Sequence, residues 1–127
     1  MRLLVCLFYS VLLIVLSLLP SSSFEDIPIY IIGEDKVAHF FMYGFYSALL
    51  IWYFEIKKKV RPKNVGAVII WVIIYCAVYG SAMEIMQYIL RSRIQRYFSI
   101  GDILADGIGA AVYGFLFTWL KVLRKRE

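Results

Sequence analysis

The chain of 127 residues carries 14 Lys and Arg against 9 Asp and Glu, and only 18% of its residues are charged. Its hydrophobic share of 62%, counted with Tyr, and its mean hydropathy of +0.76 exceed what a soluble fold of this size can bury. The same hydrophobicity excludes a disordered chain. The composition therefore predicts a one-domain integral membrane protein, in which the net charge of +5 reports loop topology and anionic lipid rather than nucleic acid.

Four apolar stretches approach or reach the length that crosses a bilayer, which is about 20 helical residues. Uninterrupted apolar runs satisfy their backbone groups in hydrocarbon by forming helices, so the predicted fold is an all-α membrane bundle of four helices. In chain order the stretches are Leu3–Leu19, Val37–Phe54, Val65–Ala82 with an amphipathic continuation to Leu90, and Ile103–Leu123.

The first stretch has a second interpretation. Arg2, the apolar core and the serines at 21–23 also fit a secretory signal peptide, although 17 apolar residues are long for its hydrophobic region. We favour a retained helix, and both interpretations place Phe24 outside. The expected parts are this first segment (1–23), a membrane domain (30–118) and a basic cytoplasmic tail (119–127).

Basic residues gather on one side of the predicted bundle. The loop between the second and third helices, the C-terminal tail and Arg2 hold ten of them, and the opposite side holds four. The positive-inside rule then places both termini in the cytoplasm and residues 20–36 and 91–102 outside. Seven of the nine acidic residues lie outside or near outer helix ends, where they can pair with the outer arginines.

A polar stripe opens the second helix. Asp35, His39 and Tyr43 are spaced i, i+4, i+8, so they share one face, and Lys36 follows Asp35 directly. Taken singly, Asp35 is explained as a first-turn acid, His39 as an interfacial side chain with a satisfied hydrogen bond, and Tyr43 as packing or an interface anchor.

The third helix carries Glu84 and Gln87 at i, i+3 spacing among apolar neighbours near its outer end. An acid in such surroundings is costly, so Glu84 is a candidate functional residue; the alternative is a protonated or salt-bridged structural acid.

The entry to the fourth helix holds Arg96, Ser99, Asp102 and Asp106. Asp102 could cap the helix, whereas Asp106 lies a turn deeper, where capping no longer explains it. Arg96 fits either an interfacial anchor or a phosphate-binding group. Small residues at 105, 109, 110 and 114 fit close helix packing.

Three separate segments thus bring polar residues to one level at the outer membrane boundary, while the rest of these helices is almost purely apolar. We predict one outward-facing site there. Its members are His39 and Glu84 as hypothetical acid/base groups, and Asp35, Lys36, Tyr43, Gln87, Arg96, Ser99, Asp102 and Asp106 as binding residues.

At these residues the sequence resembles the VanZ-like family of small bacterial membrane proteins. The family pattern is Asp-Lys-x-x-His-Phe-x-x-Tyr, then Glu-x-x-Gln, then Arg-x-x-Ser-x-x-Asp-x-x-x-Asn-x-x-Gly, and the resemblance covers roughly residues 30–118. The chain departs from it at Asp106, where the family usually has Asn. The resemblance implies a multi-pass protein of the bacterial cytoplasmic membrane; the founding member is linked to low-level teicoplanin resistance, and most members have no established activity.

Three functional hypotheses follow. The site binds a lipid-linked or cell-wall headgroup, with Lys36 and Arg96 contacting its anionic groups; or it belongs to a hydrolase or transferase of phosphorylated lipids; or the polar cluster only fixes the register of a structural bundle. The enzyme hypothesis lacks a Gly-x-Ser-x-Gly elbow and a phosphate-cradling glycine loop.

The expected partners are membrane lipids and a lipid-linked cell-wall precursor. Cofactor and oligomeric state stay open. No dedicated metal site is predicted, because a single His limits many zinc sites. The candidate ligands for a divalent ion are Asp35, His39, Glu84 and Asp102.

Overall fold

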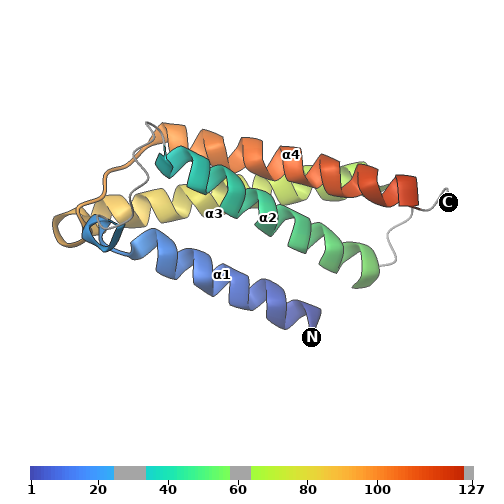
Figure 1. Cartoon of the computed structure of the whole chain (residues 1–127), viewed down its shortest axis with the longest axis horizontal. Coiled ribbons are helices and arrows are strands. Elements are labelled where there is room, and N and C mark those ends of the chain that lie inside the picture. Colours follow the sequence, from blue (N-terminus) through green and yellow to red (C-terminus); the bar gives the residue numbers. More distant parts are fainter. Residues whose placement is uncertain (25–33, 58–63, 125–127) are drawn as a thin grey trace.

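The computed structural model describes residues 1–24, 34–57 and 64–124, and every regular element in these ranges is a helix. Glu25, Asp26 and most basic residues of the loop between the second and third helices lie outside the described ranges. The elements are α1 (Arg2–Leu18), the short 3-10 helix η1 (Ser21–Phe24), α2 (Glu34–Lys57), α3 (Val65–Ile94) and α4 (Ile100–Arg124) (Figure 1).

The predicted all-α architecture with four long helices is confirmed. Three of them, α2, α3 and α4, are long and apolar enough to cross a membrane, while α1, with 17 residues, is shorter. Two helices begin three residues before their predicted starts, α2 at Glu34 and α4 at Ile100. These earlier starts place Asp35 and Asp102 in the first turns of their helices.

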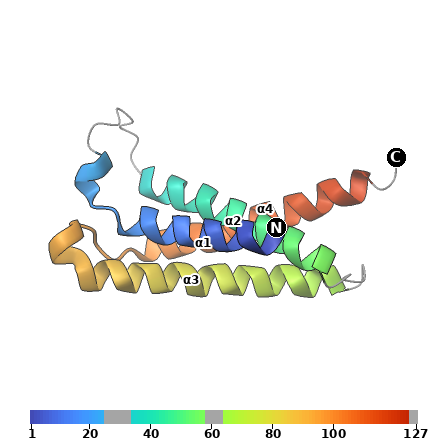
Figure 2. The same cartoon turned by 90° about the horizontal axis from the view of Figure 1, so that it is seen from below.

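The four helices run roughly alongside one another, and the closest pair is α2 with α4. Helix α3 packs against both, and α1 packs on α2 and α3 (Figures 1 and 2). The start of α1 and the end of α4 lie at the same end of the bundle. The opposite end gathers the starts of α2 and α4 with the end of α3, which is where the sequence concentrates its polar residues.

Small residues let α2 and α4 approach backbone to backbone. A Cβ atom at Gly109 would overlap the backbone carbonyl of Phe40. Next to this contact, the Ser47 hydroxyl donates to the Ala110 carbonyl across 2.8 Å. Ala110 is fully buried. The small-residue spacing of α4 therefore serves packing, as expected.

Helix α1 is held to its neighbours by hydrogen bonds as well as by apolar contact. The Tyr9 hydroxyl donates to the Met42 carbonyl of α2 at 3.0 Å. The Tyr79 hydroxyl of α3 donates to the Ser10 carbonyl of α1 at 2.8 Å. Because side-chain hydrogen bonds between helices stabilise association in an apolar solvent, α1 is an integrated part of the described bundle.

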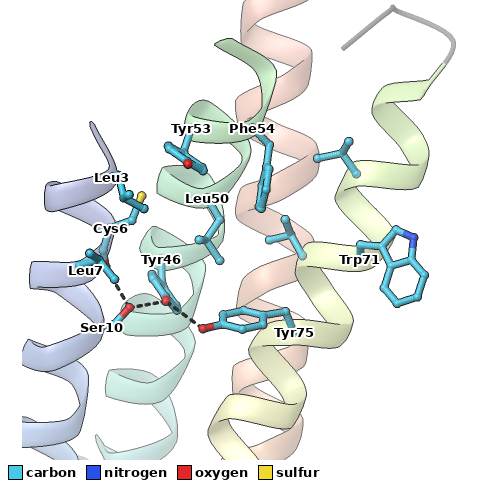
Figure 3. Close-up of a pocket in the computed structure, with 12 residues that line it drawn as sticks. Leu3, Cys6, Leu7, Ser10, Tyr46, Leu50, Tyr53, Phe54, Trp71 and Tyr75 are labelled. Carbon is cyan, nitrogen blue, oxygen red and sulfur yellow. Dashed lines mark hydrogen bonds between the residues drawn. The ribbon is translucent and has the colours of Figure 1, made fainter. Parts of the chain in front are cut away.

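A cavity of about 560 Å³ opens between the first half of α1, the second half of α2 and the first half of α3 (Figure 3). Hydrogen bonds join the hydroxyls of Ser10, Tyr46 and Tyr75 on its wall, so these polar groups already have partners. The rest of the wall is largely apolar. It includes Leu3, Cys6, Leu7, Leu50, Phe54, Val68, Trp71 and Val72.

The contact at Gly109 predicts opposite effects for two alanine substitutions on one helix. Gly109→Ala should lower the free energy of unfolding by about 1–3 kcal/mol, because its methyl group forces α2 and α4 apart. Gly107→Ala, with nothing within 4 Å of the new Cβ, should raise it by up to about 1 kcal/mol through helix propensity. Unfolding of the purified protein in mixed micelles measures both, and equal effects would contradict the close approach.

Candidate functional site

His39 and Asp106 form the buried centre of the polar end of the bundle. His39 lies in the second turn of α2 and Asp106 in the second turn of α4, and the two residues are 3% and 0% exposed. His39 Nδ1 and Asp106 Oδ1 are 2.8 Å apart, which is the length of a charge-assisted hydrogen bond. The pair therefore joins α2 to α4 through two residues that lie 67 positions apart in the sequence.

The other ring nitrogen of His39 faces the exposed rim. His39 Nε2 lies 4.0 Å from Asp35 Oδ1, one helical turn earlier on α2. The Asp35 side chain is 58% exposed, and its Oδ1 lies 3.6 Å from Arg96 Nη1. A line of polar groups thus runs from buried Asp106 through His39 and Asp35 to Arg96.

The way in which α3 ends places Arg96 next to Asp35. Gln95 caps the helix in the left-handed conformation, with φ 53° and ψ 38°, and its N–H donates to the Arg91 carbonyl. The positive φ ends α3, and the next residue, Arg96, reaches the start of α2. The expected pairing of an outer arginine with an acid is seen for Arg96, whereas Arg91 lies over the ring of Tyr88.

A second ion pair crosses from α2 to α4. Lys36 Nζ lies 3.5 Å from Asp102 Oδ1, and the Lys36 side chain is 54% exposed while that of Asp102 is 3% exposed. A Cβ atom at Gly101 would collide with the stem of Lys36, so the glycine gives the lysine its path to Asp102. Lys36 and Arg96, expected to contact anionic groups of a ligand, thus each face a carboxylate of the chain itself.

The capping role considered for Asp102 belongs to Ser99. The Asp102 N–H donates to the Ser99 hydroxyl at 3.3 Å and also lies 3.2 Å from the Ser99 carbonyl. A serine in front of the first helical turn is a preferred N-cap, because its oxygen accepts from an N–H that has no partner within the helix. The carboxylate of Asp102 is therefore not used as a cap.

Glu84 reaches the segment in front of α4. The Ser99 N–H donates to Glu84 Oε2 at 2.7 Å, and Glu84 is fully buried. Gln87, one turn further along α3, donates from Nε2 to the Ser17 carbonyl of α1 at 2.8 Å. Gln87 therefore ties α3 to α1, while Glu84 belongs with the groups at the start of α4.

Tyr43 completes the stripe on α2. Its ring stacks on the imidazole of His39, with centroids 6.0 Å apart and planes inclined by 10°. Tyr43 is fully buried, so it forms the inner wall of the polar cluster.

Several buried oxygens of this cluster have no hydrogen-bond partner among the described residues. They are the Tyr43 hydroxyl, Glu84 Oε1, Asp102 Oδ1 and Asp106 Oδ2. Of these, Asp102 Oδ1 faces the Lys36 ammonium in the ion pair described above. Leaving a buried acceptor unpaired costs on the order of 1–3 kcal/mol. The cluster thus has spare acceptor capacity and holds four carboxylates against the two cations Lys36 and Arg96.

The sequence interpretation missed Gly80. A Cβ atom there would overlap Asp106 Oδ2, so the bare backbone of α3 at Gly80 makes room for the carboxylate. The available signal was spacing, because Gly80 lies four residues before Glu84 and therefore on the same helix face.

The comparisons with known proteins bear on the chain as a whole. A family model described as VanZ/LLP1 matches residues 6–121, which include most of α1 and every residue of the predicted site. A search of curated proteins and a search of solved structures each found no match. The order and spacing of the polar motifs, their meeting at one end of the bundle and the near-complete match agree, and the chain belongs to the VanZ/LLP1 family.

Proposed function

We propose that this chain is a multi-pass protein of the bacterial cytoplasmic membrane that binds the headgroup of a lipid-linked or cell-wall component at its polar end. The observation that carries the proposal is the set of buried oxygens on Glu84, Asp102 and Asp106 that have no hydrogen-bond partner within the ranges 1–24, 34–57 and 64–124. In an apolar bundle such groups are expensive, and their default explanation is a function. A headgroup rich in hydroxyl or amine donors would satisfy them.

The proposed orientation places the polar end outside and both termini in the cytoplasm. Its support is the excess of Lys and Arg in the loop after α2 and in the C-terminal tail. The start of α1 and the end of α4 lie toward the same end of the bundle, which agrees with this topology. We further propose that α1 is retained rather than cleaved, because Tyr79 and Gln87 would lose their partners Ser10 and Ser17 without it.

Lys36 and Arg96 are the proposed contacts for anionic groups of the ligand. Both lie at the rim of the cluster, and each pairs with a carboxylate at 3.5–3.6 Å, which is longer than a tight charge-assisted hydrogen bond. A phosphate that approaches from the outer end can exchange with these carboxylates. Guanidinium matches phosphate geometry in two bonds, so Arg96 would contribute orientation as well as charge.

The cavity between α1, α2 and α3 is the proposed place for a hydrocarbon chain of the ligand. Tyr43 belongs to the polar cluster and Tyr46, three residues later on α2, belongs to the cavity wall, so cluster and cavity follow one another along the helix. The apolar wall and the volume of about 560 Å³ suit an isoprenoid or acyl chain.

A second candidate function is a hydrolase or transferase of phosphorylated lipids. The observation that favours it is the His39–Asp106 hydrogen bond, because a carboxylate that orients an imidazole with its other nitrogen toward the rim is the arrangement of a general base. The third alternative, a structural bundle without ligand, predicts that substitutions in the cluster change stability alone. A role in teicoplanin resistance is the furthest extension of the binding proposal.

The binding proposal predicts a difference between two neighbouring arginines. In nanodiscs, Arg96→Ala should weaken binding of a polyprenyl diphosphate-linked sugar by about 10- to 150-fold, because one charge-assisted contact contributes roughly 1.5–3 kcal/mol. Arg93→Ala, at an exposed position in the last turn of α3, is the matched control and should leave the affinity unchanged. Equal binding of all anionic lipids by wild type and Arg96→Ala would contradict the proposal.

If the cavity holds the hydrocarbon chain, a substitution in its wall should weaken binding of the chain without changing binding of the headgroup. Leu50→Trp should fill the cavity and weaken binding of the long-chain ligand, while binding of the water-soluble headgroup stays as in the wild type. Leu116→Trp adds the same bulk on an exposed face of α4 and is the control. Titrations of both ligands into each variant measure this, and equal affinities for the long-chain ligand would remove the cavity from the proposal.

The enzyme candidate predicts turnover that depends on His39. Wild type should release phosphate from a polyprenyl phosphate, and His39→Gln should reduce the rate by about 10²-fold or more, the contribution of a positioned general base. Ser81→Ala on α3 is the control, because the Ser81 hydroxyl donates to the carbonyl of Ala77 on its own helix. No release by the wild type would leave the binding function as the better account.

A further inference from the structure

We propose that Asp35, His39 and Asp102 form a binding site for a divalent transition-metal cation, Mn²⁺ or Zn²⁺, at the outer end of the bundle. One oxygen of each carboxylate and one ring nitrogen of the imidazole lie within 4.8 Å of one another. Asp35 and His39 come from successive turns of α2, and Asp102 comes from the first turn of α4. The inference rests on the proposed function in one respect: it places the metal in the same polar cluster that the proposed headgroup would contact.

The tautomer of His39 is the first argument for a metal. Asp106 accepts the hydrogen bond at Nδ1, since a carboxylate offers only lone pairs, so the proton of a neutral imidazole sits on Nδ1. The lone pair is then on Nε2, the nitrogen that faces Asp35. Metal-bound histidines almost always donate their second ring N–H to a carboxylate, carbonyl or water in this way. Asp106 is therefore a positioning residue of the proposed site.

The burial of Asp102 is the second and independent argument. The residue is 2% exposed, and within the part of the chain that the structure describes its Oδ1 has no hydrogen-bond partner. Lys36 Nζ lies 3.5 Å from this oxygen. Lys36 is 54% exposed on a long side chain, so it can move into solvent when a second cation arrives. We assign to Lys36 the role of a counter-charge for Asp102 that a bound metal would replace.

Access to the site comes from the rim. Asp35 is 58% exposed, so the cation can enter from the outer end without opening the bundle. Among the four candidate ligands that the sequence suggested, Glu84 is not in the group, and its Oε2 accepts the N–H of Ser99. The three remaining ligands leave coordination positions free for water or for a ligand, as in exchangeable sites.

The donor set selects the class of metal. Carboxylates suit Mg²⁺, Ca²⁺ and Mn²⁺, and imidazole suits Zn²⁺ and other later metals, so two carboxylates with one imidazole favour Mn²⁺ or Zn²⁺ over Mg²⁺ and Ca²⁺. The cation also explains how an acidic cluster can bind an anionic headgroup. In the described part of the chain, Lys36 pairs with Asp102 and Arg96 pairs with Asp35, so both cations already face carboxylates. A divalent ion on Asp35 and Asp102 supplies the positive charge that a phosphate needs.

Metal titration of the full chain in nanodiscs of neutral phosphatidylcholine tests the site without any headgroup. Isothermal titration with MnCl₂ and ZnCl₂ should give one ion per chain, with weaker binding of MgCl₂ and CaCl₂. Asp35→Asn and His39→Gln should each weaken binding at least tenfold. Asp106→Asn should weaken it by about 10–100-fold, as the loss of an outer-shell carboxylate does.

The controls separate loss of the site from loss of the fold. Asp35 is exposed, so Asp35→Asn is the variant least able to disturb packing, and thermal unfolding without metal should match the wild type. Ser81→Ala should bind metal as the wild type does. The proposal is overturned if the wild type binds none of the ions, or if Asp35→Asn and His39→Gln bind as tightly as the wild type.

A chelator distinguishes this inference from the proposed function. Addition of EDTA should weaken headgroup binding by the wild type. Metal-independent headgroup binding would remove the metal and leave the function standing. Metal binding without any headgroup binding would remove the proposed function and leave the metal site standing.

Discussion

The hydrogen bond between His39 and Asp106 is the contact on which the polar end of the bundle depends. It is buried, 2.8 Å long, and joins α2 to α4, the most extensively packed pair of helices. Gly109 allows that approach against Phe40, and Gly80 leaves space for the second oxygen of Asp106 on the side of α3. Two glycines on two helices thus leave the space that the His39–Asp106 pair needs.

The other groups of the cluster lie around this pair in an apolar environment, where buried charge must be compensated. A buried carboxylate needs compensating charge or hydrogen bonds, and the chain supplies them only in part. Lys36 and Arg96 compensate Asp102 and Asp35 from the rim, and the Ser99 N–H compensates one oxygen of Glu84. Glu84 Oε1 and Asp106 Oδ2 keep no hydrogen-bond partner in the described ranges, and these are the oxygens that the proposed headgroup would satisfy.

Membership in the VanZ/LLP1 family and three helices able to span a membrane give this cluster its context. Asp106 stands where the resemblance suggested Asn. An Asn side-chain oxygen could also accept a hydrogen bond from His39, but it would bring no charge, so the departure bears on the proposed metal more than on the orientation of the imidazole. The cavity between α1, α2 and α3 is lined by other residues, most of them apolar.

The sequence by itself determined the class of the protein and the level of its polar groups. Hydropathy located all four helices, and most of the predicted helix ends lie within three residues of the observed ends. Helical spacing put Asp35, His39 and Tyr43 on one face. Only the tertiary structure decided which partner each group received: Asp106 for His39, Asp102 for Lys36, Ser17 for Gln87, and Ser99 rather than Asp102 as the cap. The physical reason is that periodicity fixes the faces of one helix, whereas a hydrogen bond between helices depends on their rotation, axial offset and distance. Those are set by packing at residues such as Gly80 and Gly109, whose effect becomes visible only against a neighbouring helix.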